Sequence, residues 1–160
     1  MKSKKSGMLY WLWLSGLVIV LDQASKWAVV QAIHLYEQVH LLPFFSFTLA
    51  YNTGAAFSLL SEGSGWQRWF LSVVAVVVSV VLVSWLRRLK PYETLQACSL
   101  ALILGGALGN LYDRMAHGHV VDFILLHYQR YYFPAFNLAD SAITLGAGLL
   151  ILDMFLTRRV

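Results

Sequence analysis

Four long apolar stretches account for most of this chain, and they restrict its possible folds more than any other feature. About 20 helical residues cross the hydrocarbon core of a bilayer, and each stretch is long enough to do so. They span approximately Met8–Val30, Trp69–Leu86, Leu95–Met115 and Leu138–Leu156. Only 12% of the residues are charged, compared with about 25% in soluble domains. The sequence therefore predicts an α-helical integral membrane protein with four transmembrane helices, in which residues 1–160 form a single domain.

The distribution of basic residues predicts the orientation of these spans. Most of the Lys and Arg residues lie at span ends on one side of the membrane: Lys2, Lys4, Lys5, Arg87, Arg88, Lys90, Arg158 and Arg159. The loops on the other side contain only Arg68 and Arg130. The positive-inside rule places both termini in the cytoplasm. Because these anchors explain the net charge of +4, the basic balance does not indicate binding to nucleic acid.

The two outer loops have different patterns. In the first loop, aromatic or apolar residues alternate with small or polar ones over Phe45–Asn52, and this period of two predicts a strand. Pro43 precedes the strand and Gly54 follows it, as expected for residues that end regular structure. The second loop is rich in Tyr and Phe, which suit a membrane interface. We expect a small sheet on the outer surface and a short interfacial helix around Phe123–Tyr132.

Polar and charged residues gather near the outer ends of three spans. A charged residue at the centre of a membrane helix costs about 2.5–3.5 kcal/mol, so such residues are candidates for function. They are Asp22 and Lys26 in the first span, Asn110, Asp113 and Arg114 in the third, and Asn137 and Asp140 at the start of the fourth. An alternative interpretation is that Asp22–Lys26 and Asp113–Arg114 are structural ion pairs.

Small residues in the third span predict close helix packing. Gly105, Gly106 and Gly109 lie on the outer half of this span and include a GxxxG spacing. Glycines at this spacing let a neighbouring helix approach closely in a membrane. We expect them to have a packing role.

Asp122 and Asp140 differ from Asp22 and Asp113 because neither has a Lys or Arg near it in sequence. Asn137 is placed to cap the fourth span, which leaves Asp140 in the first turn, where the helix dipole stabilises negative charge. Asp122 lies among apolar residues, so desolvation favours its protonated form. Two carboxylates held close together share a proton, and such a pair can act as general base and general acid. Spacing alone does not show that the two meet.

Five short motifs together resemble those of one family, the lipoprotein signal peptidases, also called signal peptidase II. They occur in the order found in that family and cover the chain from the first span to the fourth. The motifs are DQASK at Asp22–Lys26, NTGAAF at Asn52–Phe57, GGALGNLYDR at Gly105–Arg114, VVDF at Val120–Phe123 and FNLAD at Phe136–Asp140.

The resemblance implies both an architecture and an activity. The family has four transmembrane helices, an outer β-cradle and an interfacial helix. Its members are bacterial inner-membrane aspartic endopeptidases that need no cofactor. The implied substrate is a diacylglyceryl-modified prolipoprotein, cleaved immediately before the lipid-modified cysteine. Membrane lipids are implied as surroundings, globomycin-type compounds as inhibitors, and we expect the protein to act as a monomer.

The resemblance also implies roles for individual residues. It makes Asp122 and Asp140 the catalytic pair and leaves open which of them is the base. Several other residues match positions that line the family's site and contact substrate or inhibitor: Asn52, Gly54, Asn110, Arg114 and Asn137. A further group matches a supporting polar cluster: Asp22, Lys26 and Asp113.

Two other kinds of catalytic site are compatible with the residue types. A Ser–Lys protease would use Ser141 and Lys26, but it needs a neutral lysine, and Asp22 one turn away favours the charged form. A metal site would use His117, His119 and Asp122 as ligands. Two histidines in a polar loop are more often solvated, and we expect no metal.

Two classes of non-catalytic protein are also alternatives. Buried Asp and Arg residues are typical of ion or proton pathways in transporters, but a pathway should continue across the bilayer, and the inner halves of the spans are almost wholly apolar. A binding or assembly protein leaves Asp122 and Asp140 without a role. Loss of prolipoprotein cleavage on replacing either Asp would separate the peptidase from these alternatives.

Overall fold

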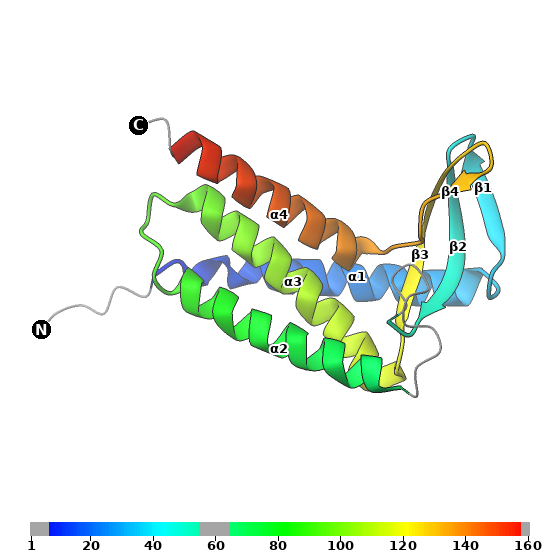
Figure 1. Cartoon of the computed structure of the whole chain (residues 1–160), viewed down its shortest axis with the longest axis horizontal. Helices are drawn as coiled ribbons and strands as arrows, with labels where there is room; N and C mark the ends of the chain where they lie inside the picture. The colour runs from blue at the N-terminus through cyan, green and yellow to red at the C-terminus, as the bar shows by residue number, and fades with distance from the viewer. Residues whose placement is uncertain (1–6, 55–64, 158–160) are drawn as a thin grey trace, which may run out of the picture.

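Four long helices form the body of the protein in the computed structural model, which describes residues 7–54 and 65–157 (Figure 1). The helices are α1 (Leu12–Ala32), α2 (Trp66–Leu86), α3 (Thr94–His117) and α4 (Leu138–Thr157), with a short 3-10 turn η1 (Leu9–Trp11) before α1. All four are long and apolar enough to cross a membrane. The four predicted spans are therefore confirmed, with boundaries that differ by a few residues.

α3 is the central helix of the bundle. It packs against α1, α2 and α4 and is the most buried of the four. The close packing predicted for its glycines is confirmed. A side chain at Gly105 would meet Val18 of α1, one at Gly106 would meet the Ala139 backbone of α4, and one at Gly109 would meet the Asp22 carboxylate. These glycines let α1 and α4 approach α3 where the polar residues lie.

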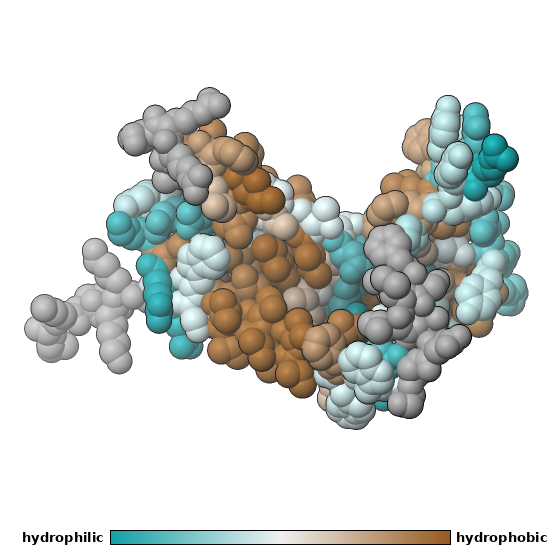
Figure 2. Space-filling view, in the orientation of Figure 1, coloured by the Kyte–Doolittle hydropathy of each residue, from teal (hydrophilic) through white to brown (hydrophobic). Residues whose placement is uncertain are grey.

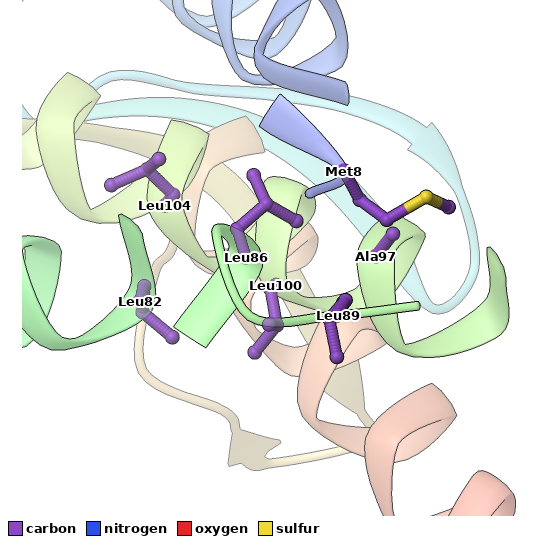
Figure 3. Packing of buried hydrophobic residues seen from close by; sticks show 7 residues of the cluster. All are labelled: Met8, Leu82, Leu86, Leu89, Ala97, Leu100 and Leu104. Carbon is purple, nitrogen blue, oxygen red and sulfur yellow. The ribbon is translucent and has the colours of Figure 1, made fainter. Parts of the chain in front are cut away.

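The end of the bundle away from the sheet is held by a purely apolar cluster. Figure 3 shows its members, which come from the start of the chain, from the end of α2 with the residues after it, and from α3: Met8, Leu82, Leu86, Leu89, Ala97, Leu100 and Leu104. The Met8 amide also donates to the Leu86 carbonyl oxygen at 3.0 Å. The start of α1 and the end of α4 both lie at this end (Figure 1).

A four-stranded antiparallel sheet covers the other end of the bundle (Figure 1). Its strands follow the order β1 (Gln38–Leu42), β2 (Phe45–Asn52), β3 (Val120–Tyr128) and β4 (Tyr131–Tyr132). The strand predicted at Phe45–Asn52 is confirmed as β2. Its polar Ser46 and Thr48 are more buried than Phe45 and Phe47. Ser46 is satisfied there, because its hydroxyl forms hydrogen bonds with the rings of His40 and His127.

The prediction of a short helix around Phe123–Tyr132 is wrong. Residues up to Tyr128 belong to β3, which pairs with β2 over Phe45–Asn52, with Ala50 opposite Asp122. Val120, Phe123 and Leu125 are buried in this arrangement. The aromatic residues that suggested an interfacial helix lie instead at the end of β3, on β4 and in the segment after β4. Pairing with a strand about 70 residues earlier decides this structure, and a local pattern cannot report such pairing.

The surface is divided in the manner of a membrane protein. Figure 2 shows apolar surface over the helices and mainly hydrophilic surface over the sheet. The apolar residues exposed on the helices include Val73, Val77 and Val80 of α2 and Leu145 of α4. In the same view the surface is hollowed between the bundle and the sheet. Of the polar residues of the spans, Arg114 and Asp140 lie at this junction.

We expect Gly106→Ala to destabilise the protein. The added methyl group would meet the Ala139 backbone, which cannot swing aside as a side chain would. Such overpacking costs about 1–3 kcal/mol and should lower the midpoint of thermal unfolding in detergent. Gly148→Ala in α4 is the matched control, because nothing lies within 4 Å of its added methyl group. Equal midpoints for the two variants would contradict the close contact between α3 and α4.

Candidate active site

A cavity of about 600 Å³ lies between the sheet and the bundle, where α4 begins. Five of the predicted site residues line it: Asn52, Gly54, Arg114, Asp122 and Asp140. The residues at 133–136 and Leu71 add an apolar wall. Ala55, Ala56 and Phe57 of the NTGAAF motif lie outside the described residues. The cavity therefore combines two carboxylates and a guanidinium with an apolar surface.

Asp140 is fixed by the start of α4. Its backbone amide donates to Asn137 Oδ1 at 2.9 Å, and its Oδ2 accepts from the Asn137 amide at 3.3 Å. This reciprocal pair is a helix cap of the kind in which two side chains satisfy free backbone amides. The cap predicted from the sequence is confirmed. It holds the half-buried Asp140 where the positive end of the helix dipole stabilises its carboxylate.

Asp122 lies on β3 in a drier environment. Its side chain is almost fully buried, and it accepts hydrogen bonds from Asn52 Nδ2 at 2.9 Å and Asn137 Nδ2 at 2.7 Å. Burial raises the pKa of Asp122 to about 6, and the charge of Asp140 contributes in the same direction, while the two amides oppose it. The stronger desolvation predicted for Asp122 is therefore confirmed. A carboxyl group with this pKa can hold or release a proton near neutral pH.

Two amide side chains connect the two carboxylates. Asn110 Nδ2 donates to Asp140 Oδ1 at 2.7 Å, and Asn137 Nδ2 donates to Asp122 Oδ1. Asn137 Nδ2 also donates to Asn110 Oδ1 at 3.2 Å. Because each carboxylate has one oxygen held by this amide pair, the separation between the two is set by α3, β3 and α4 together.

The supporting cluster predicted from the sequence lies directly behind these amides. Lys26 Nζ contacts Asp22 Oδ2 at 2.7 Å and Asp113 Oδ2 at 2.8 Å, and all three side chains are buried. The same ammonium donates to Asn110 Oδ1 at 3.1 Å. The predicted Asp22–Lys26 pair is therefore confirmed. The suggested Asp113–Arg114 pair is wrong, since successive helical residues point in different directions and Asp113 turns toward Lys26.

Asp22 also joins α1 to the start of α4. Its Oδ1 accepts from the Ala139 amide at 2.9 Å, one residue before Asp140. Gln23, which the sequence analysis missed, donates from Nε2 to Asp22 Oδ2 at 3.1 Å and to Asp113 Oδ1 at 2.8 Å. The only sequence feature that could have identified Gln23 is that it is a polar residue inside a span, next to Asp22. α1 therefore positions both α3 and α4 through two adjacent side chains.

The geometry disfavours the alternative sites. Ser141 Oγ donates to the Asn137 carbonyl oxygen at 2.9 Å, while Lys26 is held by two carboxylates and an amide, so no Ser–Lys pair is formed. Within residues 7–54 and 65–157, no group of three or more His, Cys, Asp or Glu side chains is arranged to hold a metal ion. The buried charged residues of the same ranges gather at the sheet end of the bundle, which does not suit a path across a bilayer.

We expect Lys26→Met to destabilise the protein strongly. The substitution leaves Asp22 and Asp113 buried without their cation, and breaking a buried ion pair in this way costs about 3–5 kcal/mol. The midpoint of thermal unfolding should fall accordingly. The double variant Lys26→Met/Asp113→Asn should recover part of the loss, because it removes one of the unpaired charges. A single variant as stable as wild type would contradict a structural role for the cluster.

Comparison with known proteins identifies a family. A family model described as signal peptidase (SPase) II matches residues 14–156. A lipoprotein signal peptidase of Pseudomonas fluorescens is 61% identical over 155 residues, covering 96% of this chain and 91% of the relative. One of Pseudomonas aeruginosa is 62% identical, covering 96% and 92%.

Solved structures agree with this result. A bacterial membrane enzyme determined by the in meso method at 2.3 Å resolution has a TM-score of 0.82 and 29% identity, covering 97% of this chain and 93% of that one. A second, at 1.9 Å resolution, has a TM-score of 0.81 and 28% identity, covering 94% and 96%. The sequence motifs, the fold and the extent of these matches lead to one conclusion: the chain belongs to the signal peptidase II family.

Proposed function

We propose that Asp122 and Asp140 are the catalytic pair through which this chain cleaves its substrates. Membership of the family makes the protein an aspartic endopeptidase that removes signal peptides from prolipoproteins. The observation that supports our assignment is the hydrogen-bonded connection of the two carboxylates through Asn110 and Asn137 at one cavity. On this proposal the substrate is diacylglyceryl-modified, and cleavage falls immediately before the lipid-modified cysteine.

The two carboxylates have environments suited to different roles. Asp140, at the N-terminus of α4, is the general base that takes a proton from the attacking water. Asp122, whose pKa is raised to about 6 by burial, holds the proton that passes to the carbonyl oxygen of the scissile bond. When the tetrahedral intermediate collapses, the leaving nitrogen receives the proton held by Asp140, the C–N bond breaks, and one hydroxyl of the intermediate returns its proton to Asp122 as the new carbonyl forms. This division of roles follows the pattern in which environment separates two neighbouring carboxyl groups.

The remaining site residues fall into two groups by position. Asn52, Gly54 and Arg114 line the cavity and are placed to contact the substrate backbone or an inhibitor of the globomycin type. Asn110 and Asn137 hold the carboxylates, while Asp22, Lys26 and Asp113 support those amides from behind. No step in this mechanism requires a cofactor.

The position of the cavity suits a substrate that carries lipid. The cavity lies where the apolar bundle meets the sheet (Figure 2), so acyl chains can stay in the bilayer while the peptide reaches the carboxylates. We infer a multi-pass protein of the bacterial inner membrane with both termini in the cytoplasm and the site near the periplasmic face. We further infer that residues 1–160 act as one monomeric peptidase domain.

We expect Asp122→Asn and Asp140→Asn each to abolish cleavage of a purified diacylglyceryl-modified prolipoprotein. Asn keeps nearly the same size but cannot exchange a proton with water or substrate. Ser141→Ala is the matched control in the same helical turn as Asp140, and its turnover should stay close to that of wild type. Thermal unfolding checks that the Asn variants are folded. Near-normal turnover by either folded Asn variant would remove that Asp from the mechanism.

We expect Asn52→Ala to move the pH dependence of cleavage. Activity should fall as the pH rises through the pKa of Asp122, because the proton needed by the carbonyl oxygen is lost. The Asn52 amide donates to Asp122 Oδ2 and so favours the ionised form. Without this donor the pKa rises, and the falling limb of the pH–rate profile should shift upward by about one pH unit. A limb that is unchanged, or shifted downward, would contradict the proton-donating role of Asp122.

A further inference from the structure

The buried cluster behind the two amides also binds the backbone next to each proposed catalytic residue. In α4 the Ala139 amide donates to Asp22 Oδ1 at 2.9 Å, and in β3 the Val121 amide donates to Asp113 Oδ2 at 3.4 Å. Each of these amides belongs to the residue immediately before one of the two carboxylates of the mechanism. Asp22 and Asp113 therefore fix α4 and β3 at the two points where those carboxylates leave the backbone.

Two side chains of α1, one charged and one neutral, join Asp22 to Asp113. Lys26 Nζ contacts Oδ2 of both carboxylates, at 2.7 and 2.8 Å. Gln23 Nε2 donates to Asp22 Oδ2 at 3.1 Å and to Asp113 Oδ1 at 2.8 Å. Because Gln23 is neutral, its removal takes away hydrogen bonds without removing the cation that the buried carboxylates need. Substitution of Gln23 can therefore test the geometry of the cluster apart from its charge balance.

Gln23 has its largest effect on the orientation of Asp113. This carboxylate accepts from Gln23 at Oδ1, and from Lys26 and the Val121 amide at Oδ2. A planar carboxylate held at both oxygens has a fixed rotation about its Cβ–Cγ bond, whereas one held at a single oxygen can turn. Loss of Gln23 therefore weakens the contact between Asp113 and β3. Asp22 is less affected, because Lys26 and a backbone amide of α4 still hold its two oxygens.

We propose that Gln23 is a positioning residue for the peptidase reaction, which fixes the Asp122 carboxylate relative to Asp140 by orienting Asp113. The proposal rests on the assignment of Asp122 and Asp140 as the catalytic pair. Gln23 itself lines a second cavity, of about 480 Å³, together with Val121. Asp122 lines the first cavity, because successive residues of a strand point to opposite faces. Gln23 therefore acts from behind β3, through Asp113, and not by contact with substrate.

The test compares kcat and KM of purified full-length variants with a diacylglyceryl-modified prolipoprotein. Gln23→Met keeps nearly the same size but donates no hydrogen bond. We expect its kcat to fall by about tenfold to a hundredfold, because a displacement of about 1 Å at a catalytic group is enough for such a loss. KM should stay within about twofold of wild type, since the cavity that binds substrate keeps its lining residues.

Ser15→Ala is the matched control, because it also removes a buried hydrogen bond from α1 to α3, donated by Ser15 Oγ to the Ala101 carbonyl oxygen at 2.8 Å. Ser15 lies about two helical turns before Gln23 in α1. Both variants should lower the midpoint of thermal unfolding, but only Gln23→Met should lower kcat. Equal kcat values for the two folded variants would overturn the proposal.

A double variant shows whether Gln23 acts through Asp113. After Asp113→Asn, the side chain at this position can no longer accept from both Gln23 and the Val121 amide. Adding Gln23→Met to Asp113→Asn should therefore cause little further loss of kcat, as expected for residues that act as a unit. Losses that multiply in the double variant would show that Gln23 does not act through Asp113.

Gln23→Glu provides a second test that keeps the length of the side chain. The introduced carboxyl group can donate a hydrogen bond while protonated and none once ionised, so kcat relative to wild type should fall as the pH rises. A kcat equal to that of wild type at every pH would refute the positioning role. Inactive Asp122→Asn and Asp140→Asn variants beside a fully active Gln23→Met would refute that role alone and leave the catalytic pair in place.

Discussion

The buried contact of Lys26 with Asp22 and Asp113 is the interaction on which the rest of the site depends. Charges removed from water are costly unless they are paired and hydrogen-bonded, so α1 and α3 must adopt the one arrangement that satisfies all three groups. Asp22 extends the same constraint to α4 through the Ala139 amide. Gly109 makes the arrangement possible, because a side chain there would displace the Asp22 carboxylate. A polar cluster thus fixes the relative positions of three apolar helices.

The fixed helices in turn give two chemically identical side chains different environments. Asp140 is held by a helix cap and by the amide of Asn110, in a position favourable to negative charge. Asp122 is buried on β3, where desolvation raises its pKa to about 6. The two environments are built from different elements, a helix end and a strand, joined by one pair of amides. A division of acid and base roles requires such a difference between neighbouring carboxyl groups.

β3 separates two cavities that are lined by different residues. One face of this strand presents Asp122 beside Arg114 to the cavity of the proposed peptidase site. The other face borders an aromatic cavity that backs onto the Lys26 cluster. Lys26 lies between the two cavities. It contacts Asp113, which lines the second cavity, and Asn110, which lies behind the first. The strand at Val120–Tyr128 makes this two-sided arrangement possible, because its side chains alternate between faces.

The sequence by itself determined the features that depend on local patterns. Apolar length predicted the four spans, alternation predicted β2, and the spacing of Asn137 and Asp140 predicted the cap, because each is decided within a few helical turns or one strand. Motif resemblance selected Asp122 and Asp140, but no local pattern could show that two amides connect them. Only the tertiary structure decided the strand at β3, the pairing of Lys26 with Asp113 and the role of Gln23. Each of these depends on partners about 70 to 90 residues away, whose approach is set by the packing of the whole bundle.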